Sequence, residues 1–340
     1  MRLAMDVMGG DRGPRAVLEG VALALRSPGT ETLREVHLVG RRDDIEPALR
    51  GLGLSDPRLR VFPAAEVLTM EDKPTEALRR KKDASMFRAI ELVRDGAAEA
   101  VLSLGNTGAL FAAATIRLRP VPGVERAAIA AVLPTETSEF VLLDAGANLE
   151  CKPVHLLQFA LMGEIYAREI LGKPSPRVGV LSNGTEDGKG TELTRAALEL
   201  CRQSGLNFLG HVEGHDLFAD RVDVAVTDGF TGNIVLKTAE SLGKAINRIL
   251  RTELTRSPLR MSGAWLARGA FRQLRQRMNP DSYGGAPLLG LNGVVIKIHG
   301  SAGPGVVANA IRQSASAVGH RLDDLIAARV APPPASPAAA

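Results

Sequence analysis

The sequence predicts an α/β fold in which helices flank a mostly parallel sheet, with one helical excursion. Strand-length apolar runs alternate with stretches of helical periodicity, which is the pattern of parallel α/β proteins. Aromatic residues make up only 4% of the 340 residues, and aliphatic side chains suit the buried strands of such a sheet. Loops rich in Gly and Asn follow several of the runs, at the edge where these sheets bind ligands.

The expected strands are short and apolar. They are residues 3–7, 36–39, 59–62, 100–104, 127–133, 140–143, 178–181, 207–212, 222–227 and 294–298. Helical patterns lie between them at 14–26, 75–94, 153–171, 191–204 and 232–255. Right-handed crossovers place the carboxyl ends of parallel strands on one edge, so the loops after these strands are expected to converge.

We expect a single catalytic domain over residues 1–328. Within it, residues 250–283 read as a basic helical excursion with a break at Ser257-Pro258. Residues 329–340 form a Pro/Ala tail that cannot bury a core and is expected to be disordered.

Composition excludes several classes of protein. Two cysteines provide neither a disulfide framework nor a metal pair, and we expect no metal and no cofactor. No apolar run approaches the roughly 18 residues of a membrane span, and no signal peptide is evident, so a cytoplasmic location is expected. The net charge of +4 is mild and concentrated, with nine Lys/Arg and one acid in residues 244–277, so no nucleic-acid surface is indicated.

Six loops carry the predicted chemistry. They are residues 8–11, 105–109, 144–148, 182–190, 228–233 and 299–305, and each follows a predicted strand. Gly lets the backbone approach a ligand closely, and a helix that begins there points N–H groups at an anion. Any one loop could be a simple turn, but six on one edge favour a site for a phosphate-sized anion.

Two nucleotide-binding motifs fail in these loops. Residues 184–190 resemble a Walker A loop but have one residue too few before Gly188-Lys189, and Gly190 stands where Ser or Thr is needed. Residues 303–308 match a dinucleotide fingerprint, but no strand follows to present a ribose-binding acid. His211 and His215 are interpreted as polar residues at the end of a predicted strand rather than as metal ligands.

Seven motifs resemble those of the PlsX family, the phosphate:acyl–acyl-carrier-protein acyltransferases, and the resemblance runs from about residue 1 to 325. The motifs are MDVMGGD, LTMEDKPTEALRRKKDASM, LSLGNTGA, LLDAGANLECKPVHLLQFALMG, KGTEL, TDGFTGNIVLKT and YGGAPLLGLNG. The resemblance implies conversion of acyl-carrier-protein thioester and inorganic phosphate to acyl phosphate, for phospholipid synthesis. It also implies a homodimer and a three-layer α/β/α fold similar to phosphotransacetylases and the isocitrate/isopropylmalate dehydrogenases.

Two residues are the predicted catalytic groups. Phosphate is itself the nucleophile, so the site needs a cation that holds phosphate and a donor for the thioester oxyanion. Our hypothesis gives the first role to Lys189 and the second to Asn233, which the family comparison also indicates. The remaining candidates are expected to bind substrate, although Asp228 could instead cap a helix and His299 could be a turn residue. They are Gly105, Asn106, Thr107, Gly108, Asn148, Gly190, Asp228, Gly229, Gly232 and His299.

The basic excursion has three interpretations. It could pack in a dimer, attach to a membrane surface, or dock the acidic carrier protein. The family resemblance implies peripheral membrane association, with the downstream glycerol-3-phosphate acyltransferase as a further candidate partner. The expected contact residues are Arg260, Trp265, Leu266, Arg268, Phe271 and Arg272. Rival functions are a phosphotransacetylase that uses acyl-CoA and a scaffold without catalysis.

Overall fold

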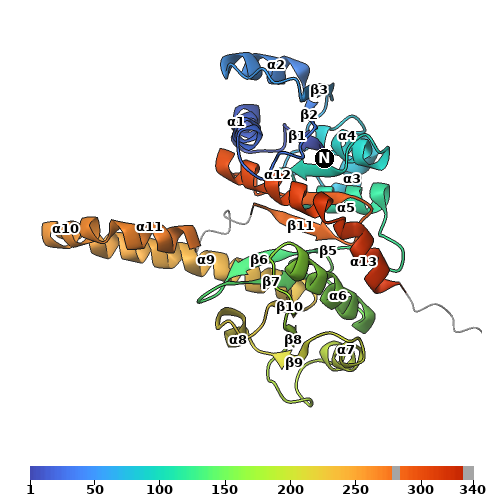
Figure 1. The fold of residues 1–340 in the computed structure, drawn as a ribbon, viewed down its shortest axis with the longest axis vertical. Helices are drawn as coiled ribbons and strands as arrows, with labels where there is room; N and C mark the ends of the chain where they lie inside the picture. Colours follow the sequence, from blue (N-terminus) through green and yellow to red (C-terminus); the bar gives the residue numbers. More distant parts are fainter. Residues whose placement is uncertain (278–283, 332–340) are drawn as a thin grey trace, which may run out of the picture.

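The computed structural model describes residues 1–277 and 284–331, which form two mainly parallel sheets flanked by helices (Figure 1). The first sheet has the order β3-β2-β1-β4-β12-β11-β5. Its strands are β1 (Arg2–Asp6), β2 (Glu35–Gly40), β3 (Leu59–Pro63), β4 (Ala100–Ser103), β5 (Ala128–Ile129), β11 (Ala286–Leu289) and β12 (Val294–Lys297).

The second sheet has the order β6-β7-β10-β8-β9, and β6 runs antiparallel to β7 as β11 does to β12. All residues of β4, β8 and β10 are buried, as expected for parallel strands covered on both faces. The strands of this sheet are β6 (Ala131–Pro134), β7 (Glu139–Leu143), β8 (Val178–Leu181), β9 (Phe208–Val212) and β10 (Val224–Val226).

Helices pack in pairs around the two sheets. Beside the first sheet, α1 packs against α12 and α4 packs against α5. Beside the second sheet, α6 packs against α7 (Figure 1). The helices of the body are α1 (Gly13–Leu25), α2 (Arg42–Gly51), α3 (Pro74–Arg80), α4 (Ser85–Arg94), α5 (Thr107–Leu118), α6 (Pro153–Glu169), α7 (Glu192–Arg202), α8 (Gly214–Phe218), α12 (Pro304–Gly319) and α13 (Leu322–Val330).

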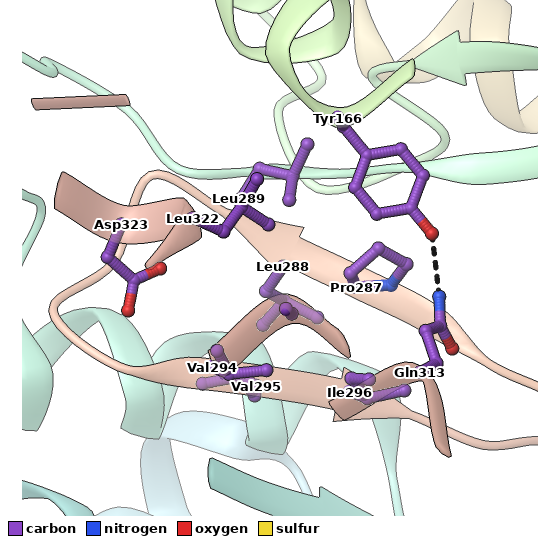
Figure 2. Close-up of a pocket in the computed structure, with 11 residues that line it drawn as sticks. Tyr166, Pro287, Leu288, Leu289, Val294, Val295, Ile296, Gln313, Leu322 and Asp323 are labelled. Carbon is purple, nitrogen blue, oxygen red and sulfur yellow. Dashed lines mark hydrogen bonds between the residues drawn. The ribbon is translucent and has the colours of Figure 1, made fainter. Parts of the chain in front are cut away.

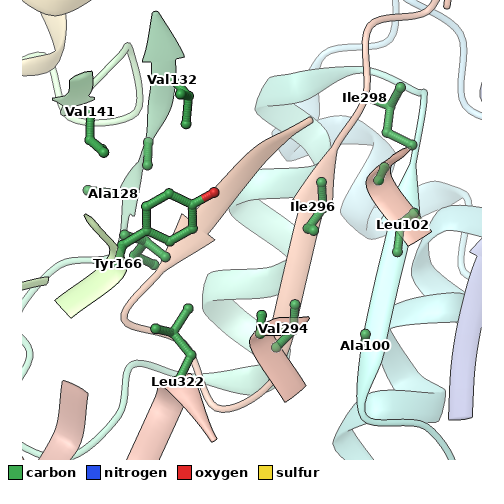
Figure 3. Packing of buried hydrophobic residues seen from close by; sticks show 14 of the residues in the cluster. Ala100, Leu102, Ala128, Val132, Val141, Tyr166, Val294, Ile296, Ile298 and Leu322 are labelled. Atoms are coloured by element: carbon green, nitrogen blue, oxygen red, sulfur yellow. The ribbon is translucent and has the colours of Figure 1, made fainter. Parts of the chain in front are cut away.

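The hydrophobic core is continuous between the two sheets. Tyr166 on α6 is fully buried and packs with side chains of β12 and α13, among them Ile296 and Leu322 (Figure 3). The same cluster includes Val141 of the second sheet and Leu102 of the first. Burial of this shared apolar surface therefore determines how the two sheets sit relative to each other.

A helical hairpin projects from the body (Figure 1). It consists of α9 (Gly229–Leu254), α10 (Pro258–Leu266) and α11 (Arg268–Arg277). Ser257 caps α10 by accepting a hydrogen bond from the N–H of Arg260, which confirms the predicted break before Pro258. Glu253 forms ion pairs with Arg256 (3.1 Å) and Arg260 (2.6 Å) at the turn. Among the described residues, no helix is long and apolar enough to cross a membrane.

Several expected boundaries were wrong. The strand expected at 127–133 divides at Ala130 into β5 and β6, which belong to different sheets. The helix expected at 75–94 is α3 and α4, and α9 begins at Gly229 rather than at residue 232. Residues 278–283 of the excursion, and 332–340 of the expected tail, lie outside the described residues.

A small internal cavity lies where β11, β12 and α13 meet. Tyr166 and Gln313 border it and share a hydrogen bond of 2.7 Å (Figure 2). Asp323 also borders it and accepts a hydrogen bond from the N–H of Gly293 (3.0 Å). Burial raises the pKa of Asp323 from 3.8 to about 7, so its carboxylate is costly at neutral pH.

We expect Asp323→Asn to stabilise the protein above pH 7. The folded state binds the Asp323 proton more tightly than the unfolded state, so stability falls as pH rises from about 4 to about 7. Asn keeps an acceptor for Gly293 and has no charge, so the gain in unfolding free energy at pH 8 should be on the order of 1–3 kcal/mol. Urea unfolding at pH 4.5 and pH 8 measures it.

The matched control is Asp324→Asn. Asp324 is exposed and pairs with Arg321 at 2.7 Å, so its loss should change stability by less than about 1 kcal/mol. Equal stability of wild type and Asp323→Asn at pH 8 would contradict the prediction.

Candidate active site

Three neighbouring strands of the second sheet supply most of the predicted site. In the order β7-β10-β8 the strands run parallel, so their following loops lie side by side. Asn148 lies in the loop after β7, Asn233 on the helix after β10, and Lys189 in the loop after β8. The topology therefore places the two predicted catalytic residues after adjacent strands, Lys189 in a loop and Asn233 on a helix.

A buried carboxylate organises the loop after β7. Asp144 is completely buried and accepts hydrogen bonds from the N–H of Ile129 (2.9 Å) and from the backbone and side-chain N–H groups of Asn148 (2.6 and 2.9 Å). Burial raises its pKa, and these donors oppose that rise. The amide of Asn148 also donates to the carbonyl of Ala127 (2.8 Å), so this predicted substrate ligand is engaged in holding the loop.

The start of α9 packs directly on this carboxylate. Asp228 caps the helix by accepting from the N–H of Thr231 (2.9 Å), which confirms the capping alternative for Asp228. A Cβ on Gly229 would lie 2.7 Å from a carboxylate oxygen of Asp144, and one on Gly232 would lie 1.9 Å from its carbonyl oxygen. Glycine is required at both positions because no side chain fits between the helix and the loop.

Asn233 lies in the second turn of α9. The helix expected from residue 232 begins earlier than predicted, because Asp228 caps it and its first residue is Gly229. The side chain of Asn233 is exposed and lies against the loop after β7, where a Cβ on Gly146 would be 3.3 Å away. The amide is thus presented from a rigid helix that is fixed by buried contacts.

Lys189 lies in the exposed loop between β8 and α7. Its stem crosses Gly184, where an added Cβ would lie 2.7 Å from the Lys189 Cγ. Gly190 has a φ of +85° and donates its N–H to Asn183 (2.9 Å), which shapes the turn into α7. Within the described chain the ammonium of Lys189 forms no ion pair, so its charge is available to an anion.

The first sheet contributes the turn from β4 to α5. Asn106 caps α5 by accepting from the N–H of Ala109 (3.0 Å), and its amide donates to the carbonyl of Met70 (3.0 Å). Thr107 and Gly108 follow in the first turn and are exposed. Asn106 therefore shapes this helix start, while the two residues after it are open to a ligand.

Sequence reasoning missed a polar cluster beneath that turn. The carboxylate of Asp6, at the end of β1, accepts hydrogen bonds from Ser85 (2.7 Å) and Ser103 (2.6 Å). Ser103 in turn accepts from the N–H of Gly105 (3.1 Å). Burial raises the pKa of Asp6. A charged residue that ends an apolar strand was the available signal, both here and at Lys297 of β12.

The remaining candidates have simpler surroundings. His299 is exposed, and its Nδ1 lies 2.9 Å from the hydroxyl of Ser301 in the same turn. Burial raises the pKa of the Cys151 thiol to about 11 and that of Cys201 to about 12. Neither cysteine has the thiolate character that a nucleophile needs.

Comparison with known proteins identifies the family. A family model described as "Fatty acid synthesis protein" matches residues 1–323. The chain is 46% identical to the phosphate acyltransferase of Akkermansia muciniphila over 332 residues, covering 96% of this chain and 95% of that protein. The chain belongs to the phosphate acyltransferase family. A second member, from Pelotomaculum thermopropionicum, is also 46% identical and covers 95% of this chain and 93% of its own. The protein is therefore an acyltransferase.

Solved structures share the fold at low sequence identity. A phosphotransacetylase from Streptococcus pyogenes has a TM-score of 0.65 and 17% identity, covering 94% of both chains. A branched-chain phosphotransacylase from Enterococcus faecalis has a TM-score of 0.58 and 14% identity, covering 94% of this chain and 99% of its own. The predicted phosphotransacetylase-like α/β architecture is confirmed, as two sheets rather than one.

We expect Gly232→Ala to disrupt the site. The added methyl would meet the Asp144 carbonyl at 1.9 Å, so the start of α9 must shift away from the loop after β7. Overpacking of this kind costs about 1–3 kcal/mol, and the shift should also lower acyltransferase activity by displacing Asn233. Thermal unfolding and an acyl phosphate assay measure the two effects.

Gly243→Ala is the matched control on the same helix. A Cβ on Gly243 meets nothing within 4 Å, so Ala should stabilise the helix by up to about 1 kcal/mol with unchanged activity. Equal behaviour of the two variants would show that the contact between α9 and Asp144 is unimportant.

Proposed function

We propose that the protein transfers a fatty acyl group from acyl carrier protein to inorganic phosphate, and that the acyl phosphate serves phospholipid synthesis. The observation that carries this proposal is the placement of Lys189 and Asn233 after the adjacent parallel strands β8 and β10. One provides a cation without an ion pair among the described residues, and the other provides an exposed amide. The family membership supports the same reaction.

The proposed reaction needs no covalent enzyme intermediate. A phosphate oxygen attacks the carbonyl carbon of the thioester, the C–S bond breaks, and the thiolate leaves and takes a proton from solvent. Lys189 holds the phosphate as a flexible point charge, and Asn233 donates its side-chain N–H to the oxyanion that develops on the carbonyl. The raised pKa values of Cys151 and Cys201 agree with a mechanism that uses neither thiol.

Lys189→Ala and Asn233→Ala should both lose acyl transfer. Removal of one oxyanion donor costs about 3–4 kcal/mol of transition-state stabilisation, so Asn233→Ala should lower kcat by about 10²–10³-fold. Lys189→Ala should chiefly raise KM for phosphate. Steady-state formation of acyl phosphate from acyl-carrier-protein thioester measures both values.

Thr185→Ala, at an exposed position in the same loop as Lys189, is the control and should resemble wild type. A parallel assay with acyl-CoA tests the rival donor, and faster turnover with acyl-CoA would assign the protein to coenzyme A thioesters. Near-normal turnover by a folded Lys189→Ala protein would refute the role given to Lys189.

We also propose that the hairpin attaches the enzyme to anionic membranes. The tip of the hairpin, helix α10, exposes large apolar side chains. Leu259 is 84% exposed, Leu266 76% and Trp265 63%. Arg268 stacks on the Trp265 ring at 4.4 Å, so a cation and an amphipathic ring occupy one position. Such a combination suits an interface where arginine meets lipid phosphate and apolar groups enter the bilayer. Of the other expected contacts, Phe271 is half-buried and Arg260 is paired with Glu253.

Trp265→Ser combined with Leu266→Ser should release the protein from vesicles. Wild type should float with vesicles that contain phosphatidylglycerol and much less with neutral phosphatidylcholine, because both apolar insertion and charge contribute. Ile116→Ser removes an equally exposed apolar side chain from the body, on α5, and should float like wild type. Equal flotation of the double variant and wild type would exclude the tip as the attachment point and leave carrier-protein docking or dimer packing as its role.

A further inference from the structure

The loop that carries Lys189 is exposed, but the residue after Lys189 is tightly confined. Gly190 has a φ of +85°, a left-handed conformation that favours glycine. A Cβ on Gly190 would lie 2.2 Å from the hydroxyl oxygen of Thr194, on α7, and 2.8 Å from that of Ser182, at the end of β8. The backbone that follows Lys189 therefore passes so close to α7 and β8 that no side chain fits there.

Arg195 contacts the same stretch of backbone from α7. Its Nη1 donates to the carbonyl of Gly190 (3.1 Å) and, more weakly, to the carbonyl of Gly188 (3.5 Å). These two carbonyls belong to the residues on either side of Lys189. One guanidinium group therefore spans the segment of backbone that carries the Lys189 side chain.

The sequence of α7 offers Arg195 other partners that it does not use. Glu192 and Glu199 lie three residues before and four residues after Arg195, at spacings that allow ion pairs on a helix. Within the described residues Arg195 forms an ion pair with neither of them, and Glu199 pairs with Arg202 at 2.9 Å. Because helical side chains lean toward the N-terminus of their helix, Arg195 reaches back to the loop that precedes α7.

The helix dipole makes this position unfavourable for a cation. Arg195 is the fourth residue of α7, and the N–H groups at a helix start carry partial positive charge that repels a guanidinium. The two loop carbonyls offer partial negative charge in its place, and hydrogen bonds from a charged donor are stronger than neutral ones. The bonds to the loop therefore account for an arginine at this position.

Other contacts hold the N–H side of the same segment. The carbonyl of Glu186 accepts from the N–H of Lys189 (2.9 Å), and Nδ1 of His211 on β9 lies 3.4 Å from that carbonyl. His211 is buried, so it contacts the loop from inside the protein. The side chain of Asn183 accepts from the N–H of Gly190 (2.9 Å). Arg195 adds bonds to the carbonyls of a segment whose N–H groups are already bonded.

We infer that Arg195 is a positioning residue that fixes the backbone of Lys189, so that the ammonium is presented to phosphate from a set direction. The inference rests on the proposed function, in which Lys189 holds inorganic phosphate, and deepens it. Arg195 acts through Lys189 and does not bind phosphate itself. Because the loop is ordered beforehand, less conformational freedom is lost when phosphate binds.

Arg195→Met tests the inference in the full-length enzyme, since it keeps the apolar stem and removes every donor. Loss of one or two hydrogen bonds should raise KM for phosphate about three- to tenfold and leave kcat within about twofold. Arg42→Met is the matched control, because Arg42 is an exposed helical arginine on α2 that pairs with Glu46 at 3.2 Å, and it should match wild type. A fall in kcat with unchanged KM would place Arg195 in another step and overturn the inference.

A double-mutant cycle separates positioning from direct binding. If Arg195 acts only through Lys189, Arg195→Met should change KM for phosphate by less than about twofold in the Lys189→Ala background. If Arg195 contacts phosphate or attracts it by its charge, the rise of about three- to tenfold should persist in that background. The second result would overturn the inference.

Amide hydrogen exchange tests the order of the loop without any reaction. In Arg195→Met, peptides that cover residues 183–190 should exchange at least about threefold faster than in wild type, because the bonded N–H groups of Lys189 and Gly190 open more often. In Arg42→Met the same peptides should exchange as in wild type. Unchanged exchange in Arg195→Met would overturn the inference whatever reaction the protein performs.

Together the two measurements distinguish failure of this inference from failure of the proposed function. Faster exchange with an unchanged KM for phosphate would support positioning by Arg195 and refute the phosphate-holding role given to Lys189. Unchanged exchange with a raised KM would show that Arg195 acts on phosphate without ordering the loop, which overturns the inference and leaves the proposed function standing.

Discussion

The buried carboxylate of Asp144 is the constraint on which the second-sheet half of the site depends. It joins three segments that are distant in sequence. It accepts hydrogen bonds from Ile129 at β5 and from Asn148 in its own loop, and it lies against Gly229 at the start of α9. Removing a charged group from water costs several kcal/mol unless hydrogen bonds replace the lost hydration. Here backbone N–H groups replace the hydration that Asp144 loses. The loop geometry therefore stabilises the carboxylate, and the carboxylate stabilises the loop.

The first sheet also has a buried carboxylate that accepts hydrogen bonds, that of Asp6. Its carboxylate also lies at the end of a central parallel strand, and it binds Ser103, which holds the N–H of Gly105. In both sheets a buried acid fixes the backbone of a glycine-rich loop, and glycine lets that backbone pass close to the acid. A Cβ on Gly9 would lie 2.7 Å from the Asp6 carboxylate, as one on Gly229 would from Asp144. The glycines are thus a consequence of the buried acids as well as of any ligand.

Most of the parallel strands could be predicted from sequence because burial on both faces leaves continuous apolar runs. The missed elements lacked that signal. Strand β11 contains Pro287 and pairs antiparallel near the sheet margin, so its pattern is not that of a buried parallel strand. The run at 127–133 is uniformly apolar because β5 and β6 are both buried, and only tertiary structure shows that the chain changes sheets at Ala130.

The candidate site was predictable to a similar degree and for similar reasons. The predicted loops rich in glycine and asparagine do follow strands, but the role of each side chain depends on contacts distant in sequence. Asn148 and Lys297 illustrate this, since both interact with carbonyls far along the chain, at Ala127 and Leu104. No periodicity encodes such contacts. A charged residue in an apolar strand is the one local feature that could have indicated Lys297.

The division of the site between two sheets has a consequence for how its geometry is controlled. Lys189 and Asn233 belong to the second sheet, whereas the start of α5 and Lys297 belong to the first. Their relative positions are set by the shared core around Tyr166, whose hydroxyl accepts a hydrogen bond from Gln313 on α12. Packed interiors transmit small displacements because they contain few voids. The relative position of the candidate residues on the two sheets is therefore determined by apolar packing away from the charged groups themselves.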